Sequence, residues 1–385
     1  MSIFRKSLAF ALAFVSLILP LITPISAEVN YANIRTDAVS VSAQSAILID
    51  ASNDNVLFAK NADLRLPMAS TTKIMTALLA LECGDIDKSY AIPKQAVGVE
   101  GSSVYLVEGE QLTLGDLVYA LMLESANDAA EAIAIIVAGS TAAFADIMNR
   151  RAAELGLTDT HFTNPHGLDH DEHYTSAYDL ARLTSYALKN EQFRKIVSTR
   201  KTTIPFQGNE GTRLLVNHNR LLRSYEGAIG VKTGFTKRSG RCLVSAAERD
   251  GLTLVAVTIN APDDWRDHTS MLDWGFDNYV HHTFAEAGEY KLTIPVCGGT
   301  AEWTVCANAT EIAATLPRGH GEISVTVKAP RFVFAPISCG DHVGRLIYRC
   351  DGEVIGESEL YAAVEVKAKN TKKSFWEWLR ALFRF

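Results

Sequence analysis

The chain has 385 residues, of which 48% are hydrophobic and 21% are charged. This composition is typical of a protein with a packed core and excludes a disordered chain, and the length suffices for two or three domains. The net charge is −7 and no long basic run occurs in the body of the chain, which argues against binding to nucleic acid.

The N-terminus has the pattern of an export signal. Arg5 and Lys6 precede an apolar run over residues 8–22, and the segment ends in the small residue Ala27. We therefore predict a signal peptide over residues 1–27 and an exported protein at the outer face of the cytoplasmic membrane. The alternative is a retained N-terminal membrane helix.

The next segments predict a strand hairpin over residues 40–57 and a buried helix over residues 68–81. The first turn of that helix contains Ser70 and Lys73, and residues three apart share one face of a helix. A serine hydroxyl needs a base to become a nucleophile. Lysine can be that base if burial, a helix dipole or a second cation lowers its pKa. Ser-x-x-Lys alone also occurs by chance in many helices.

The middle of the chain is predicted to be helical. Residues 113–116 have the pattern of a capping box before an apolar helix that continues to Leu123. The pattern breaks at residues 124–128, and further helices follow to Val137, over residues 144–155 and up to Leu188. The break leaves Ser125 and Asn127 free to point into a cleft, although a helix cap explains Ser-Ala-Asn equally well.

The following block is predicted to be β. Strands over residues 228–234, 242–248 and 252–260 most simply form an antiparallel meander, and residues 271–280 predict a helix. Lys232 lies on the first strand and is the second cation that would lower the pKa of Lys73. Gly234 leaves room for a substrate backbone along the strand. Lys-Thr-Gly alone equally fits a strand end.

After about residue 285, short β-rich runs alternate with Gly and Pro turns, which predicts a small all-β domain. This part contains no obvious set of catalytic residue types. Cys297 and Cys306, and likewise Cys339 and Cys350, are spaced for two local disulfides in an exported protein; six free thiols are the alternative. The cysteine and histidine spacings do not fit a metal site, so we predict no metal and no cofactor.

The C-terminal residues 368–385 predict a basic linker and an amphipathic helix. Its apolar positions, which fall on one face, are Phe375, Trp378, Leu379, Leu382 and Phe383. The segment is too short to span a bilayer, which takes about 20 apolar residues. Its basic flank suits a helix that lies in a membrane surface as a peripheral anchor; a helix packed on the protein's own surface is the alternative.

Three motifs together identify a family resemblance. In order, they are Ser70-x-x-Lys73, Ser125-x-Asn127 and Lys232-Thr-Gly234, the set found in penicillin-binding proteins and class A β-lactamases. The exported chain resembles the D-alanyl-D-alanine carboxypeptidases, which are low-molecular-mass penicillin-binding proteins. Residues 164–169 and 240–243 are also similar to that family. Ala126 departs from it, because Gly or Asp is more familiar there, and should affect loop shape more than chemistry.

The resemblance covers nearly everything after the signal and implies the fold. We expect an α/β (α+β) domain like that of serine β-lactamases and transpeptidases over residues 28–282, with an antiparallel sheet and a helical subdomain. A small all-β, sandwich-like domain is expected over residues 283–367.

The resemblance also implies the activity. A serine-type carboxypeptidase would remove the terminal D-alanine from peptidoglycan stem pentapeptides through an acyl-enzyme on Ser70, and penicillin would inhibit it. Lys73 would take the proton of Ser70, and Ser125 would pass it to the departing D-alanine. The implied substrate-binding residues are Asn127, Lys232, Thr233, Gly234 and Phe235. Backbone N–H groups of Ser70 and Phe235 would form the oxyanion hole, and Lys232 and Thr233 would hold the terminal carboxylate.

Arg220, Arg241 and Arg266 are candidates for further carboxylate contacts, with solvent-facing salt bridges as the alternative. The implied partners are the stem peptide, β-lactam antibiotics and a membrane surface, and not nucleic acid. A β-lactamase shares the three motifs, but no Glu-x-x-Leu-Asn stretch, which class A enzymes need for deacylation, occurs between Asn127 and Lys232. The other alternative is a non-catalytic penicillin-binding sensor that stays acylated.

Overall fold

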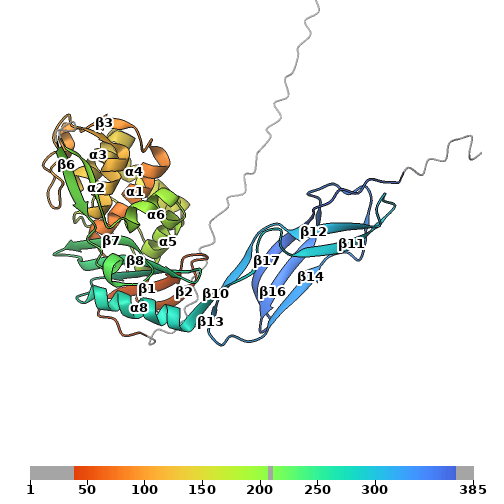
Figure 1. Ribbon diagram of the computed structural model, residues 1–385. Helices are drawn as coiled ribbons and strands as arrows, with labels where there is room; N and C mark the ends of the chain where they lie inside the picture. The colour runs from red at the N-terminus through yellow and green to blue at the C-terminus, as the bar shows by residue number, and fades with distance from the viewer. Residues whose placement is uncertain (1–38, 207–210, 370–385) are drawn as a thin grey trace, which may run out of the picture.

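The structure is a computed structural model that describes residues 39–206 and 211–369. The predicted signal peptide and the predicted anchor helix over residues 374–385 lie outside the described residues. Figure 1 shows a domain of helices packed on a sheet, followed by a separate all-β domain.

A five-stranded antiparallel sheet forms the centre of the first domain. Its order is β2-β1-β9-β8-β7. The strands are β1 (Ser45–Asp50), β2 (Val56–Lys60), β7 (Ala228–Thr236), β8 (Gly240–Arg249) and β9 (Leu252–Ile259). The predicted hairpin and meander are both present, and pairing of β1 with β9 joins them. Because β7 is an edge strand, one side of its backbone has no strand partner among the residues that the structure describes.

Both faces of the sheet are covered, which explains why β1 is buried at every position. Side chains alternate between the faces of a strand. Ile47 and Ile49 belong to the core under the helical subdomain, whereas Ala46 and Leu48 belong to the core under α8 (Asp264–Asn278). The sheet is therefore a rigid support for the residues of its edge strand β7.

The helices of the first core are α1 (Lys73–Cys83), α2 (Leu114–Leu123), α3 (Asn127–Ala138), α4 (Thr141–Glu154), α5 (Ala177–Leu188) and α6 (Glu191–Ser198). The predicted capping box is present, since Thr113 Oγ1 accepts from Asp116 N at 3.0 Å and Asp116 Oδ2 accepts from Thr113 N at 3.0 Å. Within residues 39–206 and 211–369 no single helix is long and apolar enough to cross a membrane. Only α3 and α4 taken together, a pair bent by 82°, have the length and composition of a span.

Several elements lie where the sequence predicts nothing regular or predicts different bounds. The unpredicted elements are the hairpin of β5 (Lys201–Phe206) and β6 (Gly211–Val216), together with α6, α7 (Leu221–Ser224), β4 (Gln111–Thr113) and the 3₁₀ helix η3 (Lys94–Ala96). A short strand, expected within residues 89–111, is β3 (Ser89–Ala91). The helix predicted over residues 271–280 spans Asp264–Asn278 instead, because Tyr279 and Val280 pair with Pro317 and Leu316.

The all-β domain begins with β10 (Tyr279–Ala285), which pairs with β13 (Ile312–Pro317). Its six-stranded sheet has the order β14-β16-β17-β12-β11-β15. The strands are β11 (Lys291–Cys297), β12 (Trp303–Asn308), β14 (Ile323–Lys328), β15 (Val333–Phe334), β16 (His342–Cys350) and β17 (Glu353–Ala362). The expected boundary between residues 282 and 283 thus falls inside β10.

The cysteines are free thiols. The ladder between β11 and β12 pairs Cys306 with Leu292, five residues before Cys297 along the same strand. The strand register therefore separates the two thiols, which rules out that local disulfide in this fold.

We expect residues 28–282 alone to retain acylation by penicillin. The buried residues of both cores of the first domain end at Phe276, so the β domain contributes none of them. Labelling by a fluorescent penicillin, with circular dichroism to verify folding and the full chain as control, tests this. A folded fragment that fails to label would show that the β domain shapes the site.

Candidate active site

Ser70 lies in η2 (Ala69–Thr72), a 3₁₀ turn that runs directly into α1, whose first residue is Lys73. The predicted helix is therefore present, but its first turn has the tighter form. In a 3₁₀ turn side chains at i and i+3 eclipse one another. This spacing holds Lys73 Nζ 3.0 Å from Ser70 Oγ.

Lys73 is buried among oxygen atoms. Besides Ser70 Oγ, its Nζ lies 2.7 Å from Asn127 Oδ1 and 2.6 Å from the carbonyl oxygen of His166. Burial, and then the charge of Lys232, hold the pKa of Lys73 well below its usual value, while Asp128 opposes them. A neutral amine has two N–H groups and one lone pair. In the neutral form, with its N–H groups donated to Asn127 Oδ1 and to the carbonyl oxygen of His166, the amine would turn its lone pair toward Ser70 Oγ.

The break between α2 and α3 carries the second motif. Ser125 has φ 61°, in the left-handed region, and its side chain faces the cleft. Asn127 Nδ2 donates to the carbonyl oxygen of Glu100 at 2.5 Å, and Asn127 N donates to that of Ser102 at 2.7 Å. Because the amide nitrogen is held by Glu100, Asn127 Oδ1 is left to face Lys73.

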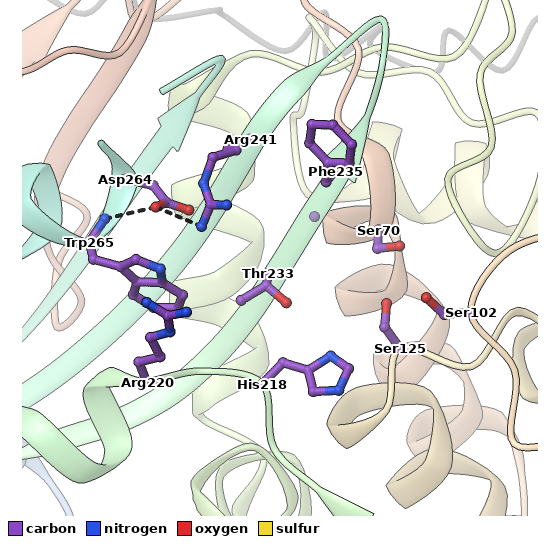
Figure 2. Close-up of a pocket in the computed structure, with 11 residues that line it drawn as sticks. Ser70, Ser102, Ser125, His218, Arg220, Thr233, Phe235, Arg241, Asp264 and Trp265 are labelled. Carbon is purple, nitrogen blue, oxygen red and sulfur yellow. Dashed lines mark hydrogen bonds and ion pairs between the residues drawn. The ribbon is translucent and has the colours of Figure 1, made fainter. Parts of the chain in front are cut away.

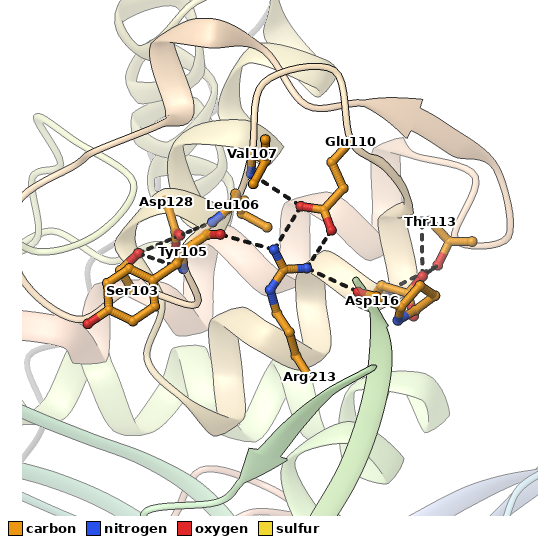
Figure 3. Close-up of polar contacts among 10 residues, drawn as sticks. Ser103, Tyr105, Leu106, Val107, Glu110, Thr113, Asp116, Asp128 and Arg213 are labelled. Atoms are coloured by element: carbon orange, nitrogen blue, oxygen red, sulfur yellow. Dashed lines mark hydrogen bonds and ion pairs between the residues drawn. The ribbon is translucent and has the colours of Figure 1, made fainter. Parts of the chain in front are cut away.

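Two carboxylates hold the loop that forms this wall of the cleft (Figure 3). Asp128 accepts from the backbone N of Leu106 at 3.0 Å. Glu110 forms a two-pronged ion pair with Arg213 of β6 at 2.5 and 2.8 Å, with only 1% and 10% of the two side chains exposed. Arg213 also donates to the carbonyl oxygen of Tyr105 at 3.0 Å. No motif marks these residues, since each partner comes from a distant part of the chain.

The third motif lies on the edge strand β7. Lys232 is 2% exposed, and its Nζ donates to the carbonyl oxygen of Thr233 at 2.9 Å. Burial lowers the pKa of Lys232 to about 7 despite the opposing charge of Glu124. A Cβ on Gly234 would lie 3.0 Å from Ser70 N and 3.2 Å from Ala69 Cβ. The missing side chain therefore serves the close packing of η2 on β7, in addition to the substrate room expected from sequence.

The loop over residues 164–169 braces the start of α1 from the other side. Gly167 has φ +91°, and a Cβ there would lie 1.9 Å from the carbonyl oxygen of Ala69. Only glycine allows so close an approach. Thr76 Oγ1 of α1 donates to the carbonyl oxygen of Pro165 at 2.6 Å. This hydrogen bond ties the loop to the helix that begins at Lys73.

Figure 2 shows the cleft that these parts surround, with a volume of about 370 Å³. Its lining residues are Ser70, Ser102, Ser125, His218, Arg220, Thr233, Gly234, Phe235, Arg241, Asp264 and Trp265. Five of the eight site residues expected from sequence thus line one cleft. The other three, Lys73, Asn127 and Lys232, are buried residues behind its wall.

The arginines suggested by sequence divide into two groups. Arg220 and Arg241 line the cleft, where Arg241 also pairs with Asp264 at 3.0 Å. Arg266 is not a lining residue of the cleft and lies 3.8 Å from Asp263. His218, which sequence reasoning missed, lines the cleft 3.2 Å from Glu124 Oε2. Glu124, the partner of His218, directly precedes Ser125 of the second motif. That neighbourhood is the local sequence signal that could have indicated Glu124 as a site residue.

Comparisons with known proteins cover almost the whole chain. Residues 32–263 match the family described as D-alanyl-D-alanine carboxypeptidase, and residues 279–368 match the family described as penicillin-binding protein 5, C-terminal domain. The chain belongs to the D-alanyl-D-alanine carboxypeptidase family. This membership makes it a serine hydrolase and confirms the predicted family and activity.

Individual relatives agree with this D-alanyl-D-alanine carboxypeptidase assignment. The D-alanyl-D-alanine carboxypeptidase DacF of Bacillus subtilis (strain 168) is 32% identical over 90% of this chain and 92% of its own length. DacC of Escherichia coli (strain K12) is 30% identical over 98% and 96%. The crystal structure of penicillin binding protein 5 from Haemophilus influenzae matches with a TM-score of 0.70 at 27% identity, over 86% of this chain and 98% of that one. The predicted fold class is confirmed by this likeness.

Proposed function

We propose that Ser70 is the nucleophile of this carboxypeptidase and that Lys73 is its base. The observation that carries the proposal is the setting of Lys73 Nζ, which is buried 3.0 Å from Ser70 Oγ. No carboxylate among the described residues is in hydrogen-bond contact with it. The Ser70 proton moves to the lysine lone pair as Oγ attacks the carbonyl carbon between the last two D-alanines. The oxygen of that carbonyl becomes the oxyanion.

Collapse of the oxyanion breaks the C–N bond and leaves an ester on Ser70. The departing amine needs a proton, and Ser125 at the rim of the cleft relays it from Lys73. Water then attacks the ester, restores the Ser70 hydroxyl and releases a peptide shorter by one residue. The backbone N–H of Ser70, held against Gly234, and that of Phe235 stabilise the oxyanion.

The free edge of β7 suits a substrate backbone that aligns as an added strand. In this pose Thr233 and the charge of the buried Lys232 hold the terminal carboxylate. Asn127 acts by holding Lys73, because its amide nitrogen is already donated to Glu100. Arg220 lines the same cleft and adds positive charge. The substrate class is therefore a peptide with a free C-terminal carboxylate, as in peptidoglycan stem peptides.

Release of D-alanine from a stem pentapeptide analogue tests the proposed function. Turnover of the peptide with stoichiometric penicillin acylation supports the carboxypeptidase. Rapid turnover of penicillin without D-alanine release would support a β-lactamase. Stable acylation with neither turnover would support a sensor.

The pH dependence follows from the two lysines. Lys232 has a pKa of about 7, so its charge is present below that pH and is lost as the pH rises. Lys73 becomes protonated, and useless as a base, as the pH falls through its own lowered pKa. We expect a bell-shaped profile of kcat/KM whose falling limb lies near pH 7. Lys232→Arg, which stays charged, should shift that limb upward; an unchanged falling limb in this variant would assign it to another group.

We also propose that the enzyme is exported and held at the outer face of the cytoplasmic membrane, where it acts in cell-wall peptidoglycan biosynthesis and influences cell shape. The N-terminal charge and apolar pattern supports export. The amphipathic pattern of the C-terminal residues, preceded by Lys367, Lys369, Lys372 and Lys373, supports a peripheral anchor. A substrate fixed in the wall suits an enzyme tethered nearby.

Deletion of residues 374–385 is expected to release the mature protein from anionic liposomes. The deletion removes the five large apolar side chains of the predicted apolar face, and burial of each is worth roughly 1.5–3 kcal/mol before ordering costs. D-alanine release from soluble peptides should be unchanged. Liposome sedimentation measures the first effect; sedimentation equal to that of the full chain would contradict the anchor.

A further inference from the structure

Three exposed aromatic side chains lie on neighbouring strands of the β domain, and we call them the distal patch. They are Trp303, Phe332 and Phe334, of which 54%, 48% and 71% is exposed. The rings of Phe332 and Phe334 meet edge to face with centroids 5.4 Å apart. Most exposed hydrophobic residues are scattered singly, so a cluster of aromatics indicates a surface that contacts something.

Strand register explains why these side chains share one face. Trp303 of β12 pairs with Pro295 of β11, and Phe334 of β15 pairs with Cys297, two residues further along β11. Paired residues, and residues two apart on one strand, point to the same side of a sheet. The alternate residues, such as Val296 and Val333, pack into the domain core. The sheet therefore directs Trp303 and Phe334 outward together.

The distal patch lies beside the point where the described chain ends. Ala368 forms a bridge with Gly299, and Lys369 N donates to the carbonyl oxygen of Gly298 at 2.8 Å. Gly298 directly follows Cys297, the residue paired with Phe334. In Figure 1 this end of the β domain is the one farthest from α8. The described chain therefore ends next to the patch, at the end of the β domain away from the active site.

Basic residues outnumber acidic ones at this end of the β domain. Arg331, Lys367 and Lys369 are exposed, and none of them forms an ion pair within residues 39–206 and 211–369. Exposed acids at this end include Glu302, Asp341 and Glu365, and Lys372 and Lys373 follow in the sequence. The balance is positive, which favours an anionic surface as the occupant. The residues after 373 contain Arg380 and Arg384 against Glu377, so charge disfavours the chain's own basic tail.

We propose that the distal patch inserts into the surface of a membrane that contains anionic lipid. This inference rests on the proposed location at a membrane and adds a second contact to the proposed tail anchor. Aromatic side chains concentrate at the membrane–water interface, and nearby lysine and arginine add attraction to anionic lipid. Two contacts on one body bind more tightly than either alone. They also fix the direction of the β domain, which directs the catalytic domain away from the bilayer.

The main test is the variant Phe332→Ser/Phe334→Ser in the mature full chain. Binding is measured by sedimentation with vesicles of phosphatidylglycerol and phosphatidylcholine. We expect apparent affinity to fall at least about tenfold, because two apolar side chains leave the interface. Val325→Ser is the matched control, since Val325 is also 48% exposed but lies on β14, at the opposite edge of the same sheet. Unchanged penicillin labelling and melting temperature verify folding.

A second measurement locates the contact. Vesicles with brominated acyl chains should quench tryptophan fluorescence less in Trp303→Phe than in the unaltered protein, because bromine quenches only inserted rings. The tail tryptophans are present in both proteins, so the difference reports Trp303 alone. Equal quenching would show that Trp303 does not reach the bilayer and would overturn the proposal.

The outcomes separate this proposal from the alternatives. Unchanged affinity of the double variant overturns it. If the tail packs on the patch, the double variant should free the tail and bind vesicles more tightly, which is the opposite sign. A dimer of the unaltered protein that the double variant loses on size exclusion would assign the patch to a second copy. If deletion of residues 374–385 leaves vesicle binding intact but the double variant weakens it, the proposed tail anchor is contradicted and the membrane contact of the distal patch is supported.

Discussion

The Ser70→Ala variant is expected to lose covalent labelling by fluorescent penicillin and release of D-alanine from peptides. The substitution removes the only atom proposed to form the acyl bond, while η2 keeps its packing against Gly234 because Ala69 and the backbone of residue 70 are unchanged. Complete loss, rather than partial loss, is expected, since the remaining lysine has no hydroxyl to activate. Gel fluorescence and intact-protein mass measure the label.

Ser198→Ala is the control for this variant, because Ser198 is an exposed residue at the end of α6 whose hydroxyl donates to the carbonyl oxygen of Lys195. It should label normally. Non-covalent binding of penicillin to Ser70→Ala should also persist, since the groups that hold the carboxylate remain. Labelling that survives Ser70→Ala would mean that another serine is the nucleophile.

The Lys73→Arg variant is expected to acylate about 10²-fold more slowly or worse, the usual scale for the loss of a general base. Arginine keeps a positive charge but does not give up its proton near neutral pH, so it offers no lone pair to the Ser70 hydroxyl. The larger guanidinium must also fit where Lys73 is now enclosed by Asn127 and His166. Stopped-flow acylation by a chromogenic β-lactam measures the rate.

A Lys73→Met variant separates chemistry from packing. Methionine fills much of the same buried space without charge, although it leaves the Asn127 and His166 oxygens without their donor. Both variants should therefore be slow, whereas their melting temperatures should differ. Near-normal acylation in either one, with Ser70 intact, would remove Lys73 from the mechanism.

Local features of the fold were predictable because neighbouring residues determine them. The capping box of Thr113 and Asp116 depends on side chains that bond to backbone groups a few residues away. The meander of β7, β8 and β9 follows from tight turns. By contrast, β5 and β6 were not expected, and Tyr279 and Val280 were expected to be helical although they pair across the sheet with β13.

The sequence by itself determined which residue types the site contains, because the three short motifs carry their chemistry in residues three or fewer positions apart. Only the tertiary structure decided how those motifs meet. Contact between Lys73 and Asn127, 54 positions apart, depends on how α1 packs against α3. The approach of η2 to β7 and to the loop at Gly167 depends on two missing side chains whose neighbours are distant in sequence. Likewise, the exposed aromatics at the far end of the β domain share a face only because strand register aligns them. Local patterns fix the backbone of each segment, but distances between segments follow from packing over the whole core.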